Sequence, residues 1–367
     1  MRFEKFNNNW SRTTISKVCV CNPKNEDKLD DEFIYIDLES VEKGVLKSKN
    51  IIHLKNAPSR AQRILYKNDI LFQSVRPYQR NNYLLNEDDD FLQYVASTGY
   101  IQLRTTLNPY FLFQLLNTDK INNEVMLRCT GTSYPAINSN DFSNILITIT
   151  NDRNEQNKIA KFFSLIEERI QTQIKIINDY KILKNHIIKS FIKQNGTSYL
   201  LSEIAELGRG RVINSAEISK QKNPIYPVYS SQTSNNGIMG YLDNYDYEGE
   251  YITWTTDGAN AGTVYYRNGK FNCTNVCGIL KIKNGYDAYY ISNILNCYTK
   301  KYVSTNLANP KLMNNVMANI KINLPSIEQQ KHSSKILQSI EYRVEIEEDI
   351  KLNLVKQKAF LLKNMFI

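Results

Sequence analysis

A long amphipathic helical segment occurs twice in this 367-residue chain, once near its middle and once at its end. Seven apolar residues of the second segment each have an apolar or aromatic counterpart 174 positions earlier: Ile336, Ile340, Val344, Ile350, Leu354, Leu361 and Met365 match Phe162, Ile166, Ile170, Ile176, Tyr180, Ile187 and Phe191. Their spacing mixes three- and four-residue steps, which is typical of helices that pack along a partner helix. The repeat therefore predicts that the chain contains two copies of one unit, and that each copy carries out one half of its function.

The segments between the helices also align, at a less constant spacing. Residues 15–18 resemble 201–204 at an offset of 186, and residues 110–117 resemble 289–296 at an offset of 179. At the helix starts, Glu155-Gln156 matches Glu328-Gln329 at an offset of 173. The offset between matching residues is constant in the helices and varies elsewhere. This indicates a preserved helical scaffold with different loops, as expected if the two copies recognise different targets.

The predicted fold class is α/β (α+β). Two globular domains, residues 1–150 and 197–326, are joined by long helices at 151–196 and 327–367, which form an antiparallel coiled-coil spacer with pseudo-twofold symmetry. A plausible cap, Ser326, opens the second helix. An alternative is that each helix packs only on its own domain. Short apolar runs predict strands at residues 33–38, 69–72, 145–149, 250–254, 263–266 and 276–280.

Composition excludes several classes of protein. Six cysteines without paired CxxC motifs, and only three histidines, cannot build the usual zinc ligand sets, so we expect no metal. No apolar run approaches the roughly 20 residues of a membrane span, and the N-terminus lacks the apolar core of a signal peptide. We therefore expect a soluble cytoplasmic protein without membrane contact. The net charge of +9 is spread along the chain and permits a polyanionic partner through local patches.

Several motifs, in order and mostly before or within the helices, resemble the specificity subunit of type I restriction–modification enzymes over essentially the whole chain. They are the opening Arg2-Phe3, Phe6 and Trp10, the elements Pro310 to Leu312 and Leu324 to Gln329, and the closing Leu361 to Phe366. One departure is the start of the first helix, where residues 149–155 lack the clearer Leu-Pro-Ser-Ile-Glu of residues 324–328.

The resemblance implies that each domain reads one half of a bipartite target in double-stranded DNA. It also implies that the helices act as a ruler and as a platform for two methyltransferase (modification) subunits, which use S-adenosylmethionine to methylate adenine. ATP-dependent restriction subunits would complete the nuclease. The chain itself would hold no cofactor and catalyse nothing.

Candidate DNA contacts follow from side-chain chemistry. Asn and Gln pair with adenine edges and Arg with guanine, whereas Lys, Arg, Ser and Thr hold phosphates. The candidates in the first domain form a basic stretch with a neighbouring glutamine: Arg60, Arg63, Lys67, Arg76, Arg80 and Gln73. Those in the second domain are the base-edge candidates Gln232, Asn235, Asn236, Thr256 and Asn260 and the phosphate candidates Arg267 and Lys270. The acidic residues 87–90 should face solvent, away from DNA.

Catalytic motifs are missing or isolated. Asn108-Pro-Tyr110 has no second proline and no glycine-rich cofactor loop, while Asp179-x-Lys181 and Asp349-x-Lys351 are best explained as solvated helix charges. Two alternatives stay open: a stand-alone DNA-binding protein, and a structural or adhesin protein that uses the coiled coil as a spacer.

Overall fold

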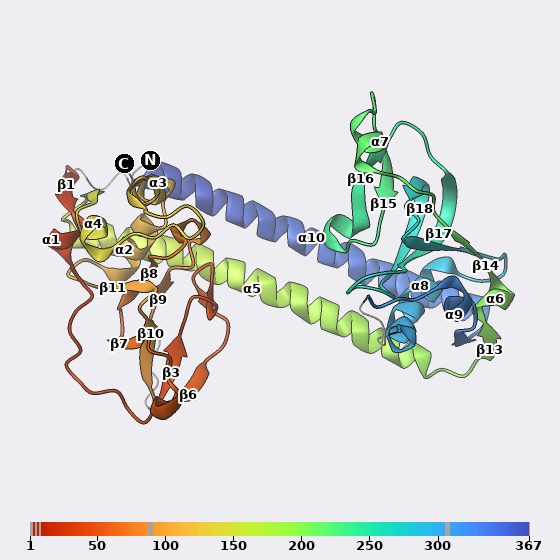
Figure 1. Cartoon of the computed structure of the whole chain (residues 1–367), viewed down its shortest axis with the longest axis horizontal. Helices are drawn as coiled ribbons and strands as arrows, with labels where there is room; N and C mark the ends of the chain where they lie inside the picture. The colour runs from red at the N-terminus through yellow and green to blue at the C-terminus, as the bar shows by residue number, and fades with distance from the viewer. Residues whose placement is uncertain (1–2, 4–5, 7–8, 87–90, 305–308, 367) are drawn as a thin grey trace. The chain divides into compact units, whose positions relative to one another are not determined.

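The computed structural model describes residues 3, 6, 9–86, 91–304 and 309–366 (Figure 1). Its chain forms two compact units, Met1–Ile174 with Asp349–Ile367 and Lys175–Glu348. The two predicted long helices are confirmed as α5 (Arg153–Ile192) and α10 (Ile327–Met365), and each helix contributes to both units. The acidic residues 87–90 lie outside the described part of the chain. The finer domain boundaries stay a prediction.

The first unit is built on two four-stranded sheets. One has the order β2-β11-β8-β9 and the other the order β6-β3-β10-β7. The strands are β1 (Ser11–Thr14), β2 (Cys19–Cys21), β3 (Glu32–Ile36), β4 (Val41–Glu42), β5 (Val45–Leu46), β6 (Asn50–His53), β7 (Ala61–Leu65), β8 (Ile70–Gln73), β9 (Tyr83–Leu84), β10 (Gln93–Ser97), β11 (Tyr100–Thr105) and β12 (Leu146–Ile149). The helices are α1 (Ile15–Val18), η1 (Leu54–Asn56), η2 (Pro77–Gln79), α2 (Pro109–Leu116), α3 (Asp119–Arg128) and α4 (Ser139–Ser143).

The second unit has one six-stranded sheet of order β14-β19-β17-β18-β15-β16. The strands are β13 (Thr197–Leu200), β14 (Ala205–Arg209), β15 (Tyr226–Tyr229), β16 (Ile238–Leu242), β17 (Tyr247–Thr255), β18 (Val264–Cys273), β19 (Cys277–Ile282) and β20 (Lys321–Leu324). The helices are α6 (Leu201–Ile204), α7 (Ser215–Ser219), η3 (Ser234–Gly237), α8 (Ala288–Tyr298), η4 (Thr299–Tyr302) and α9 (Asn314–Ala318).

Strand register confirms the internal repeat. In the first unit β1 pairs with β12 so that Ser11 faces Ile149, and in the second β13 pairs with β20 so that Thr197 faces Leu324. Ser11 and Thr197 are 186 positions apart, the offset at which residues 15–18 align with 201–204, and Ile149 and Leu324 are 175 apart, close to the offset of the helices. The sheet order β2-β11-β8-β9 recurs as β14-β19-β17-β18. The shared scaffold therefore includes the sheet as well as the helices.

The two copies differ in what is inserted into this scaffold. Between β2 and β8 the first unit inserts β3 to β7, of which β3, β6 and β7 form a second sheet with β10 and β4 pairs with β5. At the equivalent place, between β14 and β17, the second unit inserts α7, β15 and β16. Strand β15 pairs in parallel with the end of β18, so this insert extends the shared sheet instead of forming its own. The drifting offset in the sequence reflects these unlike inserts.

A buried glutamine anchors the start of each long helix. Gln156 Nε2 donates to Thr150 O (2.9 Å) and its Oε1 accepts from the Asn108 backbone N–H (2.9 Å). Gln330 makes the same two bonds, to Pro325 O (2.9 Å) and from the Asp287 N–H (3.1 Å). Gln156 thus corresponds to Gln330 at an offset of 174. The match of Gln156 with Gln329 at 173 was wrong by one residue, because both segments carry neighbouring Glu and Gln residues.

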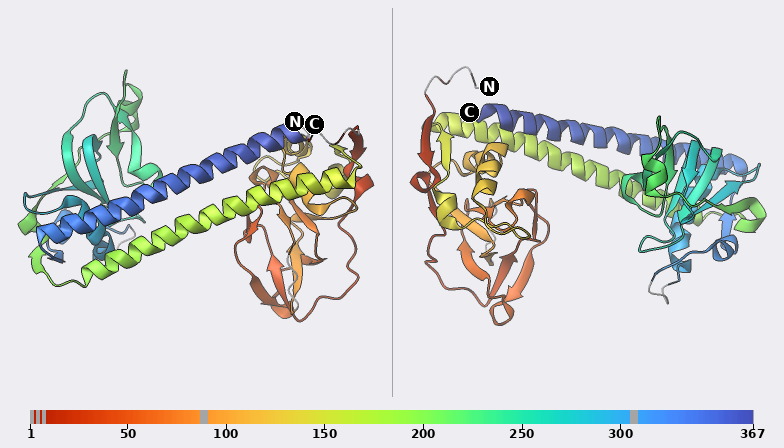
Figure 2. Two further views of the ribbon diagram at one scale, coloured as in Figure 1. Left: turned by 180° about the vertical axis from the view of Figure 1, so that it is seen from behind. Right: turned by 45° about the horizontal axis from the view of Figure 1, so that its top comes forward.

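Helix pairing is seen within each unit, where the segments of α5 and α10 lie side by side in every view (Figure 2). In the second unit Lys181 pairs with Glu348 (Nζ–Oε1 2.8 Å) and Lys184 with Glu341, so the residue numbers run in opposite directions. In the first unit Lys358 pairs with Glu167. The predicted antiparallel pairing is therefore confirmed, and the helices also join the globular cores.

The opening and closing sequence motifs meet in the first unit. The Trp10 and Phe366 rings lie 6.1 Å apart, and both contact Phe111 of α2. Phe366 also stacks on Phe163 of α5, with 6.0 Å between centroids. These motifs are therefore parts of the hydrophobic core.

In the described chain, no helix is long and apolar enough to cross a membrane.

Candidate nucleic-acid interface

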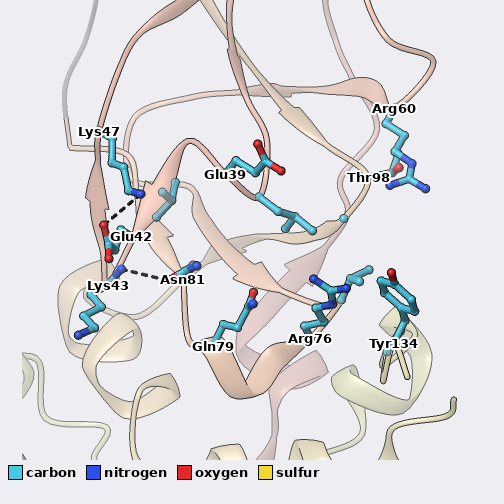
Figure 3. A pocket seen from close by; sticks show the side chains of 15 residues that line it. Glu39, Glu42, Lys43, Lys47, Arg60, Arg76, Gln79, Asn81, Thr98 and Tyr134 are labelled. Atoms are coloured by element: carbon cyan, nitrogen blue, oxygen red, sulfur yellow. Dashed lines mark hydrogen bonds and ion pairs between the residues drawn. The ribbon is translucent and has the colours of Figure 1, made fainter. Parts of the chain in front are cut away.

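The first unit contains an open cleft of about 1180 Å³, shown in Figure 3. Two of the predicted residues, Arg60 and Arg76, line it. The Arg76 guanidinium lies 4.2 Å from the centroid of the Tyr134 ring, and Figure 3 shows the two side chains next to each other. Within the described residues neither arginine forms an ion pair. The cleft therefore offers two available cations beside an aromatic ring.

The opposite part of this cleft is more strongly neutralised. Lys47 pairs with Glu42 (Nζ–Oε2 3.0 Å), and the Lys43 backbone N–H donates to Asn81 Oδ1 (3.1 Å). These two contacts are the dashed lines of Figure 3. Glu39 and Glu42 balance the charges of Lys43 and Lys47 in this part of the lining, so a polyanion would be attracted chiefly to the end with Arg60 and Arg76.

A strained turn presents Arg76 to the cleft. Arg76 and Arg80 flank η2 and both have left-handed backbones, with φ of 53° and 54°. Such angles are uncommon for residues other than glycine and are retained where the surroundings enforce them. Here the Arg76 N–H donates to Pro135 O (2.7 Å). Arg80 itself is held by Asp119 (Nη2–Oδ1 2.7 Å).

Two other predicted residues of the first unit form hydrogen bonds inside the fold. Gln73 is fully buried, donates to Val75 O (2.9 Å) and Gln79 Oε1 (2.8 Å), and accepts from the Asn81 N–H (2.9 Å). Arg63 donates to Tyr100 O, and burial lowers its pKa. Both side chains are turned inward, so they shape the fold around the cleft. Lys67 is exposed between β7 and β8.

In the second unit the structure brings the two predicted loops together. Asn260 Nδ2 donates to Thr233 Oγ1 (3.2 Å), which joins the loop at residues 256–262 to the loop at 230–237. The side chains of Asn235, Asn236 and Asn260 are all exposed. Three amides thus lie in or beside one joined pair of loops.

The remaining predicted residues of this unit fall into two groups. Thr256 is fully buried, with its hydroxyl 3.0 Å from Val276 O, and Gln232 donates to Ile238 O, so both shape the loops. Arg267 is also buried, at 6% exposure. Lys270 is exposed on β18, 3.7 Å from Glu248, and its pKa is raised by a hydrogen bond with Tyr245 and by the charge of Glu248. Only Lys270 of the two phosphate candidates reaches the surface.

The candidate loops of the two units occupy the same place in the repeat. In the first, the Ile137 N–H donates to Ser74 O (3.0 Å), and in the second the Leu312 N–H donates to Thr256 O (2.9 Å). Arg76 is therefore equivalent to Gly258, whose N–H donates to Pro310 O (3.0 Å). Sequence reasoning selected both loops independently. It missed Tyr134, although this ring directly precedes the proline that aligns with Pro310.

Comparison with known proteins places this architecture in a family. Residues 195–357 match the family model described as type I restriction modification DNA specificity domain. A putative type I specificity subunit of Mycoplasma pneumoniae, S.MpnORF289P N-terminus, is 43% identical over 142 residues, which are 38% of this chain and 75% of that protein. A second, S.MpnORF201P, is 37% identical over 191 residues, or 51% of this chain and 79% of that protein. This chain belongs to the family of type I restriction–modification specificity subunits.

Other relatives are matched over a smaller share of their length. The specificity subunit of the type I restriction enzyme MpnII, also from Mycoplasma pneumoniae, is 42% identical over 146 residues, which cover 39% of this chain and 43% of that protein. The fold agrees with the crystal structure of the type I S subunit from M. genitalium, with a TM-score of 0.64 at 17% identity, over 100% of this chain and 99% of that one. A structure from a study of type I R-M complex assembly has a TM-score of 0.61 at 20% identity. This match covers 98% of this chain and 97% of that one.

Proposed function

We propose that this chain is the DNA-reading, non-catalytic subunit of a type I restriction–modification complex, and that each unit reads one half of a bipartite target. The observation that carries this proposal is a duplicated scaffold with unlike inserts, in which the loop that holds Arg76 and the loop that holds Asn260 take equivalent places. Identical readers would need no different inserts, whereas a two-part target requires them. The chain would act in the cytoplasm, where its DNA target lies.

In the first unit, the cleft supplies the proposed contacts. Arg76 has the planar pair of donors that matches guanine O6 and N7, and the turn that holds it is already formed. Arg60 is exposed nearby and suits a phosphate. Tyr134 holds the Arg76 guanidinium by a cation–π contact, which limits its freedom before DNA arrives. Gln73 and Arg63 support the turn and the strand behind it, Arg80 directly follows η2, and Lys67 lies before β8, apart from the residues that line the cleft.

In the second unit, Asn235, Asn236 and Asn260 are the proposed base-edge contacts. Asparagine amides carry the donor and acceptor that adenine N7 and N6 require. Lys270 is the proposed phosphate contact. Gln232, Thr256 and Arg267 would act from behind the surface, by holding these loops.

The long helices are the proposed docking platform for two methyltransferase subunits, to which restriction subunits would add. Several apolar side chains on them stay exposed within the units, including Leu165, Ile182, Leu352 and Phe360. Exposed apolar residues on otherwise packed helices favour a protein partner. The partner subunits would supply S-adenosylmethionine and the methyl transfer.

The test is selection from random duplexes by the full chain in complex with its modification subunits. The wild-type complex should enrich a motif of two specified halves. Arg76→Ala should relax one half and Asn260→Ala the other, each by about 1–3 kcal/mol of discrimination. Arg128→Ala, which removes a half-buried arginine of α3 that pairs with Glu124, is the control. Loss of both halves in either variant, or one continuous motif, would contradict the proposal.

A further inference from the structure

The second unit contains a buried guanidinium with no charged partner among the described residues. Arg267 is 6% exposed and lies between two tyrosine rings, 3.6 Å from the centroid of Tyr229 and 4.4 Å from that of Tyr265. Its Nε donates to Thr253 Oγ1 (3.2 Å), and its Nη2 donates to Asn236 O (2.8 Å). Burial of a charge without a counter-ion is expensive, so a role beyond packing is expected for it.

The acceptor of that second bond lies in an unusual turn. Three consecutive residues, Asn235, Asn236 and Gly237, have left-handed backbones with φ of 48°, 54° and 82°. Asparagine tolerates this region better than other non-glycine residues, but two in succession still need external support. Arg267 provides it, since its Nη2 bonds Asn236 O and lies close enough to Gly237 that an added methyl group would be 3.2 Å away.

Other bonds close the turn around its base. The Ser230 N–H donates to Gly237 O (2.9 Å), and Asn260 reaches Thr233 from the neighbouring loop. Within the turn and its base, these bonds engage only backbone atoms and the Thr233 hydroxyl, to which the side-chain amide of Asn260 donates. The amides of Asn235 and Asn236 are left exposed and, among the described residues, without a hydrogen bond. The turn is thus fixed while its recognition groups stay available.

We propose that Arg267 is a positioning residue that holds the Asn235–Asn236 turn in the conformation that reads an adenine edge in the major groove. This inference rests on the proposed function. A fixed turn loses little conformational entropy on binding, so its amides discriminate between bases more strongly than those of a mobile loop. The stacked, forked guanidinium is suited to this task in a way that a lysine ammonium is not.

A competing role for Arg267 is direct contact with a phosphate. The two roles differ in their consequences. Loss of a phosphate contact would weaken binding to all duplexes alike and would reduce the slope of log affinity against log salt by about one. Loss of a positioning residue would reduce discrimination at one half of the target and leave the affinity for unrelated duplexes unchanged.

The test compares Arg267→Lys, Asn235→Ala and Asn236→Ala in the full chain with its modification subunits. Lys281→Met, which removes an exposed charge from strand β19, beyond β17 in the same sheet, is the matched control. Each adenine of the selected target is replaced in turn by 7-deazaadenine, which lacks the N7 acceptor. At one position the wild-type affinity should fall about 10-fold to 100-fold, and at least one Asn variant should no longer respond there. Arg267→Lys should lose most of this response while the salt slope stays unchanged.

Hydrogen exchange gives a readout that does not depend on DNA. Amides of residues 230–238 should exchange faster in Arg267→Lys and at the wild-type rate in Lys281→Met. Unchanged exchange, or an equal loss of affinity for every duplex, would overturn the positioning role. If the turn loosens as expected but the wild-type complex selects no motif, the proposed function fails instead.

Discussion

The residues repeated between the two units are buried polar ones as well as apolar ones. Gln156 and Gln330 each accept a hydrogen bond from the cap residue of a short helix and donate one to the backbone just before their own long helix. The caps, Asn108 and Asp287, in turn accept from the third residue of α2 and α8. A buried polar group needs every one of these partners, which restricts the side chain more tightly than apolar packing does.

Replacement of Gln330 by Leu should destabilise the second unit. The change keeps most of the volume but leaves Pro325 O and the Asp287 N–H without their partner, at a cost of about 1–3 kcal/mol each if water cannot replace it. Thermal or denaturant unfolding of the full chain measures this. Lys331→Ala, at the next and exposed position of α10, should change stability by less than about 0.5 kcal/mol. Equal stabilities of the two variants would contradict the role given to Gln330.

Tyr290 carries a prediction about pH. It is fully buried, its hydroxyl has no hydrogen-bond partner among the described residues, and burial raises its pKa to about 12. Because the folded state keeps this proton while the unfolded chain releases it near pH 10, the contribution is complete below pH 10 and is lost as the pH rises towards 12.

Tyr290→Phe should therefore be neutral or stabilising at pH 8, within about 1 kcal/mol. Above pH 10 the variant should lose stability less steeply than the wild type, by up to about 1.4 kcal/mol per pH unit. Denaturant unfolding at a series of pH values gives both numbers. Parallel curves for the two proteins would show that Tyr290 does not titrate as described.

The sequence predicted candidate residues by type and only partly by position. Asn235, Asn236 and Asn260 were expected at base edges and are exposed, which leaves that role available to them. Gln73 and Thr256 have equally suitable chemistry but are buried. The difference arises because a side chain next to a strand end faces either the core or the surface. Which of the two it faces depends on tertiary register. Polar character in a loop does not determine it.

At the scale of elements, an ion pair joins the two long helices in each unit, and in the second unit a tyrosine ties the short helix α8 to that pair. In the second unit Tyr289 of α8 donates to Glu341 of α10, which also pairs with Lys184 of α5. In the first unit Lys358 of α10 pairs with Glu167 of α5, at offsets of 174 from Lys184 and Glu341. Burial and the charge of Glu167 raise the pKa of Tyr110, the counterpart of Tyr289. The ion pair fixes the register of the two helices in each unit.

A double-mutant cycle on Lys184→Met and Glu341→Gln should show this register function. The side chains are 20% and 43% exposed, so the coupling energy should be modest, about 0.5–1 kcal/mol. The cycle on Glu167→Gln and Lys358→Met should give a similar value, because the geometry repeats. Denaturant unfolding of the full chain measures both cycles. Zero coupling in both would mean that apolar packing alone sets the register.

Both long helices and five scaffold strands could be predicted from the sequence, whereas most strands of the inserts could not. The six predicted strands correspond to β3, β8, β12, β17, β18 and β19, and both long helices are present. These elements have long apolar periodicity or continuous apolar runs. Strands β6, β15 and β16 are short and mostly half-buried or exposed, and β15 and β16 contain Pro227 and Gly240, so no period distinguishes them from loops. Their position in the fold follows from pairing with distant strands.

At the scale of the whole molecule, recognition and scaffold are separate parts of the chain. Replacement of residues 210–246 by the corresponding insert of another family member should change one half of the target and leave the other half intact. This segment contains β15, β16 and the Asn235–Asn236 turn, but none of the shared scaffold strands. Selection from random duplexes would reveal the altered half. A change in both halves would show that the insert is not an independent reader.

The most direct measurement of the central claim is a map of methylated adenine in the genome of a host that carries this chain with its modification subunit. Two different readers on one repeated scaffold predict a single motif with two unlike specified halves and unspecified bases between them. The Asn236→Ala variant should change one half only. A palindromic motif, a continuous motif, or no methylation that depends on this chain would contradict the account.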